Sequence, residues 1–270
     1  MKFSLPVSAC VLTPQSLFRA AEFKRAVETY CEHLPSLVPE RWGWWEPLSR
    51  TFDENDLDSL IPENGICETV FWKKIGRNKA EGSFSVRWKS KTPGLLDTHA
   101  NISFTTDIKN INQEEVVVWM KEECRRSSAD FGFVDALPDY HREFAVESGS
   151  AQFGDRYRIV THLLRHWLPD VFWGTIFGPA YVALFGIDRL LSAPAAIVEK
   201  IADDMVYVQL SKELRDVIED PLGMQHRRNL FKRHLATDAF YETGRGYDRL
   251  ERSPYGDIFK VPAFKLFDDE

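Results

Sequence analysis

Three segments with alternating apolar and polar residues, 68–75, 82–89 and 98–106, constrain the fold of this chain more than any other feature. Alternation with a period of two is typical of strands that bury one face, and the Gly, Asn and Pro residues between the segments favour turns. The segments therefore predict an antiparallel meander with one solvent-exposed face. The next segment, 112–126, begins with acidic residues and ends with two arginines, which favours a helix packed on this meander.

The residues before the meander predict one strand and one helix. Residues 3–12 are rich in apolar and small side chains and favour a first strand. Thr13 and Pro14 then resemble a helix start, and apolar residues at helical spacing continue until Pro35 ends the pattern. A long connection follows up to Pro62, and it contains a tryptophan cluster and a run of acidic residues.

The second half of the chain predicts a similar mixture of helices and strands. In chain order, we expect a short apolar segment at 129–137, a helix at 157–167, a helical turn after Gly178 and Pro179, strands near 195–200 and 204–210, and a basic helix near 222–236. The predicted fold class is α+β, with antiparallel sheets and packed helices. We expect two lobes of similar style, 1–146 and 147–270, that share a layer or form one continuous domain.

Composition limits the classes of partner and the compartment. The 34 Lys and Arg residues against 41 Asp and Glu residues give a net charge of −7, which opposes direct binding to nucleic acid or to an anionic membrane and favours a basic protein partner. The four cysteines form no C-x-x-C pair, which predicts buried thiols in a reducing compartment. Because no signal peptide and no apolar run of about 20 residues is recognised, a cytoplasmic location is expected.

No set of residues predicts catalysis, and we expect no enzyme activity, no cofactor and no metal. His162 and His166 have the i, i+4 spacing of some zinc ligands, but Leu163 stands where the general base would be, and no third ligand is near in sequence. The tripeptide at 130–132 matches the magnesium-binding motif of kinases without the other kinase motifs. Residues 138–144 begin like a nuclease signature but lack its catalytic lysine.

A family resemblance rests on the glycine- and aromatic-rich segment 172–200. There, Gly-Pro-Ala-Tyr-Val-Ala-Leu-Phe-Gly at 178–186 leads through Leu-Leu-Ser-Ala-Pro at 190–194 to Val-Tyr-Val-Gln-Leu at 206–210. These motifs resemble the immunity protein 52 family of bacterial polymorphic and type VI toxin systems. The resemblance extends to Arg41-Trp42-Gly43 with Glu46-Pro47, and to the residues His-Leu-Ala-Thr-Asp-Ala-Phe at 234–240.

The resemblance implies a cytoplasmic antitoxin without enzyme activity that binds and neutralises a cognate effector, which in this family is often a nuclease with a restriction-endonuclease-like fold. Two alternatives stay open on the sequence. One is an enzyme, a hydrolase or transferase with a dispersed site. The other is a chaperone or adaptor that loads an effector.

The expected partner-binding residues lie in the connection before the meander. They are the carboxylates Asp53, Glu54, Asp56 and Asp58 together with Trp45 and Glu46. A basic nuclease groove would attract such carboxylates, although an acidic run is equally typical of a solvated connection. We expect Trp42 and Trp44 to be buried anchors between the first helix and the meander, and Trp45 and Glu46 to contact solvent.

Overall fold

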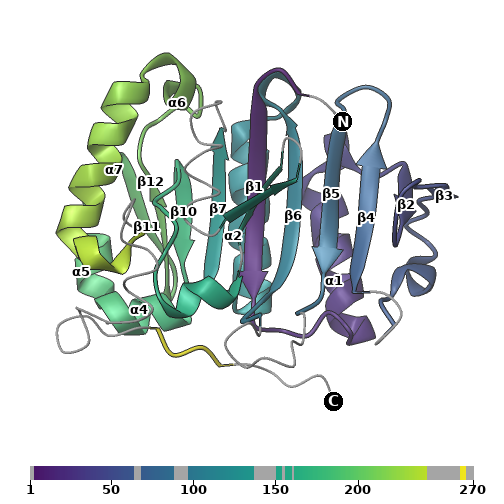
Figure 1. Ribbon diagram of the computed structural model, residues 1–270, viewed down its shortest axis with the longest axis horizontal. Coiled ribbons are helices and arrows are strands. Elements are labelled where there is room, and N and C mark those ends of the chain that lie inside the picture. The colour runs from purple at the N-terminus through teal and green to yellow at the C-terminus, as the bar shows by residue number, and fades with distance from the viewer. Residues whose placement is uncertain are drawn as a thin grey trace.

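A ten-stranded antiparallel sheet forms the centre of the protein (Figure 1). The computed structural model describes residues 3–63, 68–87, 97–136, 150–153, 156–159, 161–241 and 262–265. The strand order in the sheet is β11-β12-β10-β7-β1-β6-β5-β4-β2-β3. The strands are β1 (Pro6–Thr13), β2 (Arg41–Gly43), β3 (Arg50–Thr51), β4 (Thr69–Lys74), β5 (Ala80–Ser85), β6 (Ala100–Asp107), β7 (Phe131–Ala136), β10 (Gly174–Phe177), β11 (Ile197–Ala202) and β12 (Met205–Gln209). A separate hairpin pairs β8 (Ser150–Phe153) with β9 (Arg156–Ile159).

Strand β1 occupies the middle of the sheet and is buried along its whole length. It pairs with β6 from Pro6 to Thr13 on one side and with β7 from Val7 to Leu12 on the other. Because both neighbours bond to it, the first strand of the chain joins the meander to the strands that follow. The alternation of Val7, Ala9 and Val11 with Ser8 and Cys10 gives β1 one purely apolar face and one mixed face.

Two long helices, α1 (Ala20–His33) and α2 (Gln113–Ser127), cover the apolar face and lie behind the sheet in Figure 1. Asn112 caps α2 because its side chain accepts a hydrogen bond from the Glu114 amide at 3.0 Å. The buried ring of Tyr30 joins both helices to the sheet. It contacts the rings of Trp72, Phe84, Phe104 and Trp119 at centroid distances of 5.1 to 6.2 Å.

The opposite face of the meander carries buried hydroxyl groups instead of a solvent-exposed surface. Cross-strand hydrogen bonds satisfy these groups. They join Ser8 to Thr105 at 2.7 Å, Ser83 to Ser103 at 3.3 Å and Thr69 to Ser85 at 3.2 Å. The expectation of one wet face was wrong for β5 and β6, which are buried on both faces. On this side of the sheet, β9 contacts β1 and β6. Alternating burial is retained only in β4.

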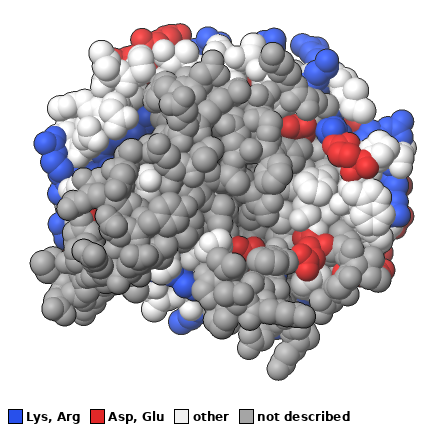
Figure 2. Space-filling model, viewed as in Figure 1, with Lys and Arg blue, Asp and Glu red and all other residues white. Residues whose placement is uncertain are grey.

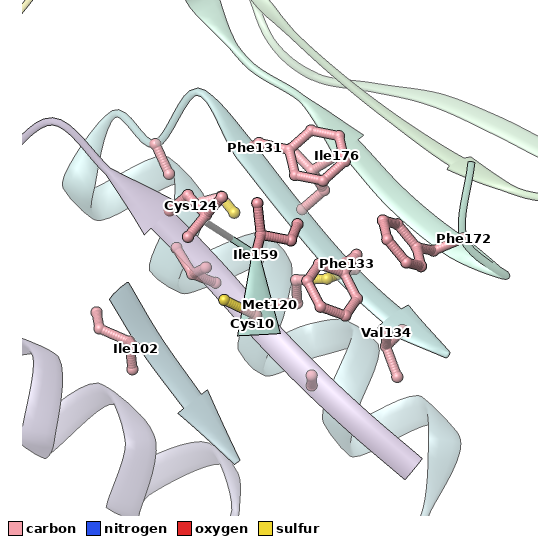
Figure 3. Packing of buried hydrophobic residues seen from close by; sticks show 14 of the residues in the cluster. Cys10, Ile102, Met120, Cys124, Phe131, Phe133, Val134, Ile159, Phe172 and Ile176 are labelled. Atoms are coloured by element: carbon pink, nitrogen blue, oxygen red, sulfur yellow. The ribbon is translucent and has the colours of Figure 1, made fainter. Parts of the chain in front are cut away.

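Beyond β7, the same face is covered by aromatic side chains and by the later helices. These helices are α4 (Pro179–Phe185), α5 (Ile187–Leu191), α6 (Asp216–Glu219) and α7 (Pro221–Leu235). The rings of Phe133 and Phe172 stack at 4.1 Å, and Phe177 stacks on Phe231 of α7 at 5.8 Å. Figure 3 shows Phe133 and Phe172 on one side of β7 and Met120 and Cys124 of α2 on the other. The core therefore extends through the sheet on both faces.

The glycine-rich segment forms a tight corner between β10 and α4, as its composition predicts. A Cβ atom on Gly178 would lie 1.9 Å from the carbonyl oxygen of Ala129, so only glycine fits this approach. Pro179 then opens α4, and Gly186 ends it with a φ of 85°. A hydrogen bond holds the corner next to the start of β7: the Gly178 amide donates to the carbonyl oxygen of Asp130 at 2.8 Å.

Most predicted elements are confirmed, with three exceptions. The first strand, both long helices, the meander, the strand at 129–137, the last two strands and the basic helix all form, with shifted ends. The predicted start of the first helix at Thr13 and Pro14 was wrong, because Thr13 still pairs with Ala100 in the sheet and α1 begins only at Ala20. The helix predicted at 157–167 was wrong. Residues 156–159 form β9, and Thr161–Arg165 form the 3-10 helix η5. Short strands β2 and β3 also lie in the segment that was interpreted as a connection.

The expected division into two lobes falls at residues 146 and 147, which lie outside the described residues. Across this division, β10 of the second range pairs with β7 of the first from Gly174–Val134 to Phe177–Phe131. The two ranges therefore share one sheet. Whether either range folds alone stays a prediction. In the part of the chain that the structure describes, no helix is long and apolar enough to cross a membrane.

A partly buried ion pair holds α1 against α2. Arg25 donates through Nη1 to Oε1 of Glu123 at 3.1 Å, and the Glu123 side chain is fully shielded from solvent. Burial raises the pKa of Glu123 to about 7, and the neighbouring Arg25 offsets only part of this effect. Such a pair positions the helices but adds little net stability, because removing both charges from water costs free energy.

We expect Gly178→Ala to destabilise the fold or to prevent folding, because the added methyl group would overlap the Ala129 carbonyl oxygen and displace the start of α4. Gly76→Ala is the matched control, since its added methyl group would meet only the flexible Glu40 carboxylate. Urea unfolding should give a loss of at least about 2 kcal/mol for Gly178→Ala and a much smaller change for the control. Equal stability of the two variants would contradict the close approach.

We expect Glu123→Gln to reduce the pH dependence of stability. Because the folded-state pKa is raised from 4.5 to about 7, the stability contributed by this group is fully present below about pH 4.5 and is lost as the pH rises through 7. The wild-type free energy of unfolding should therefore fall between pH 5 and pH 8 by up to about 2–3 kcal/mol from this group. A carboxamide cannot titrate, so this part of the decrease should vanish in the variant.

Glu122→Gln is the control for this measurement. Burial raises the pKa of Glu122, but its bonds to Arg125 and Arg126 lower it more, so the pKa lies below its usual value and the group stays ionised over this range. Its replacement should leave the slope between pH 5 and pH 8 unchanged. An unchanged slope in Glu123→Gln would show that Glu123 does not titrate in this window.

Candidate functional site

The segment with the predicted partner-binding residues forms one end of the ten-stranded sheet. Strand β2 pairs with β4, where Trp42 lies opposite Trp72, and the two-residue strand β3 pairs with β2, where Arg50 lies opposite Trp42. Trp42 is only 2% exposed, which confirms it as a buried anchor. An aromatic side chain such as Trp42 favours a strand that packs one face on the core. The short loop after it reverses the chain, so that β3 pairs with β2 at the edge of the sheet.

A cation stacked on two indole rings fixes the loop between β2 and β3. The guanidinium carbon of Arg50 lies 4.7 Å from the ring centroid of Trp42 and 4.8 Å from that of Trp44. Contacts of this kind contribute about 0.5–2 kcal/mol each, with the larger values in desolvated surroundings. The Trp44 side chain, which was expected to be a buried anchor, is only half-buried, and its ring contacts the Trp45 ring at 5.9 Å. Trp45 itself is 64% exposed, as expected, so it projects from a braced loop.

Polar contacts tie down the rest of this loop. Arg41 donates through Nη1 to the carbonyl oxygen of Ser49 at 3.3 Å and to the hydroxyl of Thr51 at 3.0 Å. The exposed Glu46 forms a salt bridge with Lys73 of β4. Its carboxylate is therefore already matched by a positive charge within the protein.

The acidic run 53–58 follows β3 and contacts α1. Asp58 forms a salt bridge with Lys24 of α1 at 2.7 Å, and Asp53 accepts hydrogen bonds from the amide and side chain of Asn55 at 2.9 and 3.0 Å. Glu54 lies close to Cys31. Burial mainly, and the negative charge of Glu54 in addition, raise the pKa of the Cys31 thiol to about 12.

The six predicted residues are thus close in the chain, but only some of their carboxylates are neutralised by a salt bridge. Asp53, Glu54 and Asp56 are exposed and, among the described residues, form no salt bridge, whereas Glu46 and Asp58 are paired. Figure 2 shows basic and acidic side chains side by side at the right-hand end, where Figure 1 places β2 and β3. We define Trp45, Asp53, Glu54 and Asp56 as the hairpin surface. Trp45 lies in the loop before β3, and the three carboxylates lie in the segment after β3.

The two histidines with metal-like spacing do not share a helix face. His162 lies in η5 and His166 follows it, and 3-10 geometry turns residues four apart to different sides. Burial lowers the pKa of both histidines, and the charge of Arg165 lowers both further, although Asp97 opposes this at His162. No group of three or more potential metal ligands occurs in the described ranges.

The kinase-like tripeptide has a structural role. Asp130 begins the turn into β7, and its carboxylate accepts from the Ala180 amide at 2.8 Å and lies 3.0 Å from Nε2 of His99. Nδ1 of His99 lies 2.7 Å from the hydroxyl of Thr98. Both carboxylate oxygens of Asp130 therefore contact groups that hold the corner before α4 in place. The nuclease-like residues at 138–144 lie outside the described residues.

A buried charge cluster that the sequence did not predict lies beneath the basic helix. Arg228 of α7 is fully buried and donates through Nη2 to Asp135 at 2.6 Å and through Nε to the carbonyl oxygen of Val171 at 2.9 Å. Burial raises the pKa of Asp135 to about 6, although Arg228 lowers it. Lys232 pairs with Asp170, whose pKa is raised by burial but lowered more by Lys232 and Arg228. The spacing of Arg228 with Met224 and Phe231 marks it as inward-facing.

The Val-Tyr-x-Gln-Leu motif is also structural. The Tyr207 hydroxyl donates to Oε1 of Gln209 at 2.7 Å, and Gln209 donates through Nε2 to the carbonyl oxygens of Ser211 and Lys212 at 2.8 and 3.0 Å. These bonds fix the turn after β12. The family-like motifs thus specify packing, whereas the exposed residues of the hairpin surface do not take part in it.

No family model matches the chain, and no curated protein matches it. Among solved structures, the chain is similar to a Pseudomonas aeruginosa T6SS protein at 12% sequence identity and a TM-score of 0.48. The match covers 92% of this chain and 88% of that one. The resemblance to the immunity protein 52 family stays a prediction.

The contrast between two neighbouring tryptophans is testable. We expect Trp42→Ala to lower the free energy of unfolding by about 3–5 kcal/mol, because it removes a buried indole and one of the two rings under Arg50. Trp45→Ala should change it by less than about 1 kcal/mol, since Trp45 is largely exposed. Urea unfolding followed by circular dichroism measures both. Comparable losses in the two variants would show that Trp45 also supports the core.

Proposed function

We propose that this protein is an immunity protein that binds and neutralises a cognate toxin effector of a type VI or polymorphic toxin system. The proposed toxin is a nuclease with a restriction-endonuclease-like fold. The family resemblance of the buried motifs supports this proposal, and so does the location of the candidate residues on the surface. The proposed mode of action is binding, without any chemical step carried out by this chain.

The observation that carries the proposal is the braced hairpin surface. Arg50 lies over Trp42 and Trp44 and fixes the loop from which Trp45 projects. A large aromatic side chain that is already held in place can be buried by a partner at low cost in conformational entropy. Exposed tryptophans are therefore frequent energetic centres of protein interfaces. Trp45 has this character, while Trp42 serves the fold.

The three unpaired carboxylates give the hairpin surface its charge preference. A nuclease must present positive charge to the phosphates of its substrate, and carboxylates on an inhibitor can compete for that charge. Asp53, Glu54 and Asp56 form no salt bridge among the described residues, so their charges are available to a basic partner. Glu46 and Asp58 contribute less, because Lys73 and Lys24 already neutralise them. The net charge of −7 acts in the same direction over a longer range.

A division between buried and exposed residues suits a family that neutralises different toxins. Residues that define the fold, such as Trp42 and Gly178, have fixed neighbours and cannot vary with the partner. Exposed residues in a loop can change without loss of packing. The proposal therefore assigns partner choice to the hairpin surface and stability to the motifs.

The first test asks whether the chain neutralises a toxin at all. The protein encoded beside this gene is expressed in a bacterial host with and without the chain. If the neighbouring protein is a toxin, co-expression should restore growth, and the two purified proteins should form a stable complex. A toxic neighbour that is neither bound nor neutralised would contradict the proposal.

The second test concerns the carboxylates. We expect the triple substitution Asp53→Ala, Glu54→Ala and Asp56→Ala to slow association with that toxin and to weaken the dependence of the on-rate on salt, because exposed interface charges act mainly through steering. Association is measured by stopped flow or surface plasmon resonance at low and at physiological salt. A loss of about tenfold in on-rate at low salt is the expected size.

The matched control removes three exposed carboxylates elsewhere, by Asp204→Ala, Glu213→Ala and Glu219→Ala. The control changes the net charge by the same amount but at other positions. If the position of the carboxylates matters, its on-rate should stay close to that of the wild type. Trp45→Ala should act differently, by accelerating dissociation. If both triple variants slow association equally, net charge steers the encounter and the hairpin surface is not the docking surface.

A further inference from the structure

A second surface of opposite charge lies at the other end of the sheet, on α5 and α7. Helix α7 contains six basic residues and no acidic one. They are His226, Arg227, Arg228, Lys232, Arg233 and His234. Arg228 and Lys232 are used in the buried cluster, whereas Arg227 and Arg233 are exposed. In Figure 2, Lys and Arg side chains gather along the left-hand rim, where Figure 1 places α7.

Reciprocal hydrogen bonds join α5 to the end of α7 and make one platform of the two helices. Arg189 donates through Nε to the carbonyl oxygen of His234 at 2.8 Å, and Nε2 of His234 lies 2.8 Å from the carbonyl oxygen of Arg189. Leu191 lies two residues after Arg189, and Leu230 lies one turn before His234 on α7. The two leucines are therefore held on neighbouring helices.

The leucines are more exposed than packing of these helices requires. Helix α7 packs on the core through Met224, Phe231 and Leu235, which are buried on its inner side, and Leu230 is not one of its buried residues. Leu230 is still 37% exposed and Leu191 is 38% exposed. We define Leu191, Leu230, Arg189, Arg227 and Arg233 as the basic platform. It combines apolar side chains with three guanidinium groups, a composition typical of protein interfaces.

The charges of the basic platform are available to a partner. Arg189, Arg227 and Arg233 are exposed, and none of the three forms a salt bridge with another described residue. In a chain with a net charge of −7, three unmatched arginines around two exposed leucines select for negative charge together with apolar surface.

We propose that the basic platform docks an acidic amphipathic segment of another protein, with the leucines of the platform covered by apolar side chains of that segment. The arginines would bind carboxylates of the partner, since a guanidinium matches a carboxylate with two parallel hydrogen bonds. This surface prefers the opposite charge from the hairpin surface. It therefore belongs to a different partner or to a different part of one partner.

Two other occupants fit the surface less well. Nucleic acid would use the arginines but leave the leucines without apolar contacts, and the overall negative charge opposes it. A second copy of this chain could offer Asp53, Glu54 and Asp56. However, contact between opposite ends of two copies closes into a dimer or a ring only for particular rotations between the copies, and otherwise it generates an open chain of molecules. An acidic segment of a different protein satisfies both the charge and the apolar side chains.

The test uses the full-length chain and a short synthetic helical peptide. The peptide carries leucines at i and i+4 surrounded by glutamates, and a scrambled peptide of the same composition is the reference. Fluorescence anisotropy should show salt-sensitive binding of the amphipathic peptide that is at least about tenfold tighter than binding of the scrambled one. Leu191→Ala with Leu230→Ala should remove this preference for the amphipathic peptide.

Charge reversal by Arg189→Glu, Arg227→Glu and Arg233→Glu should weaken binding at least about tenfold and reduce its salt dependence. The matched control is Arg77→Glu, Lys79→Glu and Lys212→Glu, which changes the net charge equally at exposed positions elsewhere. Circular dichroism verifies that both variants are folded. The proposal is overturned if the two peptides bind equally, if the control loses as much affinity as the platform variant, or if duplex DNA displaces the peptide. Sedimentation that shows platform-dependent self-association would also overturn it.

Discussion

The pairing of β1 with both β6 and β7 is the interaction on which the rest of the structure depends. Without this strand, the meander that contains β4, β5 and β6 would lose its connection to β7, β10 and β12. Because β1 is buried on both faces, the sheet needs cover on both sides. Helices α1 and α2 supply it on the apolar face. The opposite face is covered by β9 and by α4 and α7.

The local elements could be predicted from the sequence because their signals are local. Alternation marked the meander, Asn112 with the acids after it marked the start of α2, and Gly178 with Pro179 marked the corner before α4. The single sheet was harder to predict, since β1 and β7 pair across more than a hundred residues of chain. The error at 157–167 has a similar cause. Apolar residues there match a helical period, but tertiary pairing with β8 and packing on β1 favour an extended strand.

The residues of the candidate site were predictable from the sequence, but the salt bridges that neutralise some of them were not. The sequence identified the carboxylates and the tryptophan cluster, and burial separated Trp42 from Trp45 as expected. It did not indicate that Lys24 and Lys73 neutralise Asp58 and Glu46, because these partners lie on other elements. The inward position of Arg228 was visible in its spacing with Met224 and Phe231. An arginine in an apolar stripe is nevertheless easily interpreted as solvent-facing.

Both edges of the sheet are protected against pairing with another strand, which directs binding to side chains instead. Strand β3 has only two residues, and the loop before it is held by Arg41 and Arg50. Strand β11 is interrupted by a bulge between Lys200 and Ala202, and Glu199 is paired with Lys121. Short, charged and bulged edges discourage backbone pairing between molecules. A partner of this protein would therefore have to recognise projecting groups. The two sets that we propose are Trp45 with Asp53, Glu54 and Asp56 at one end, and the arginines around Leu191 and Leu230 at the other.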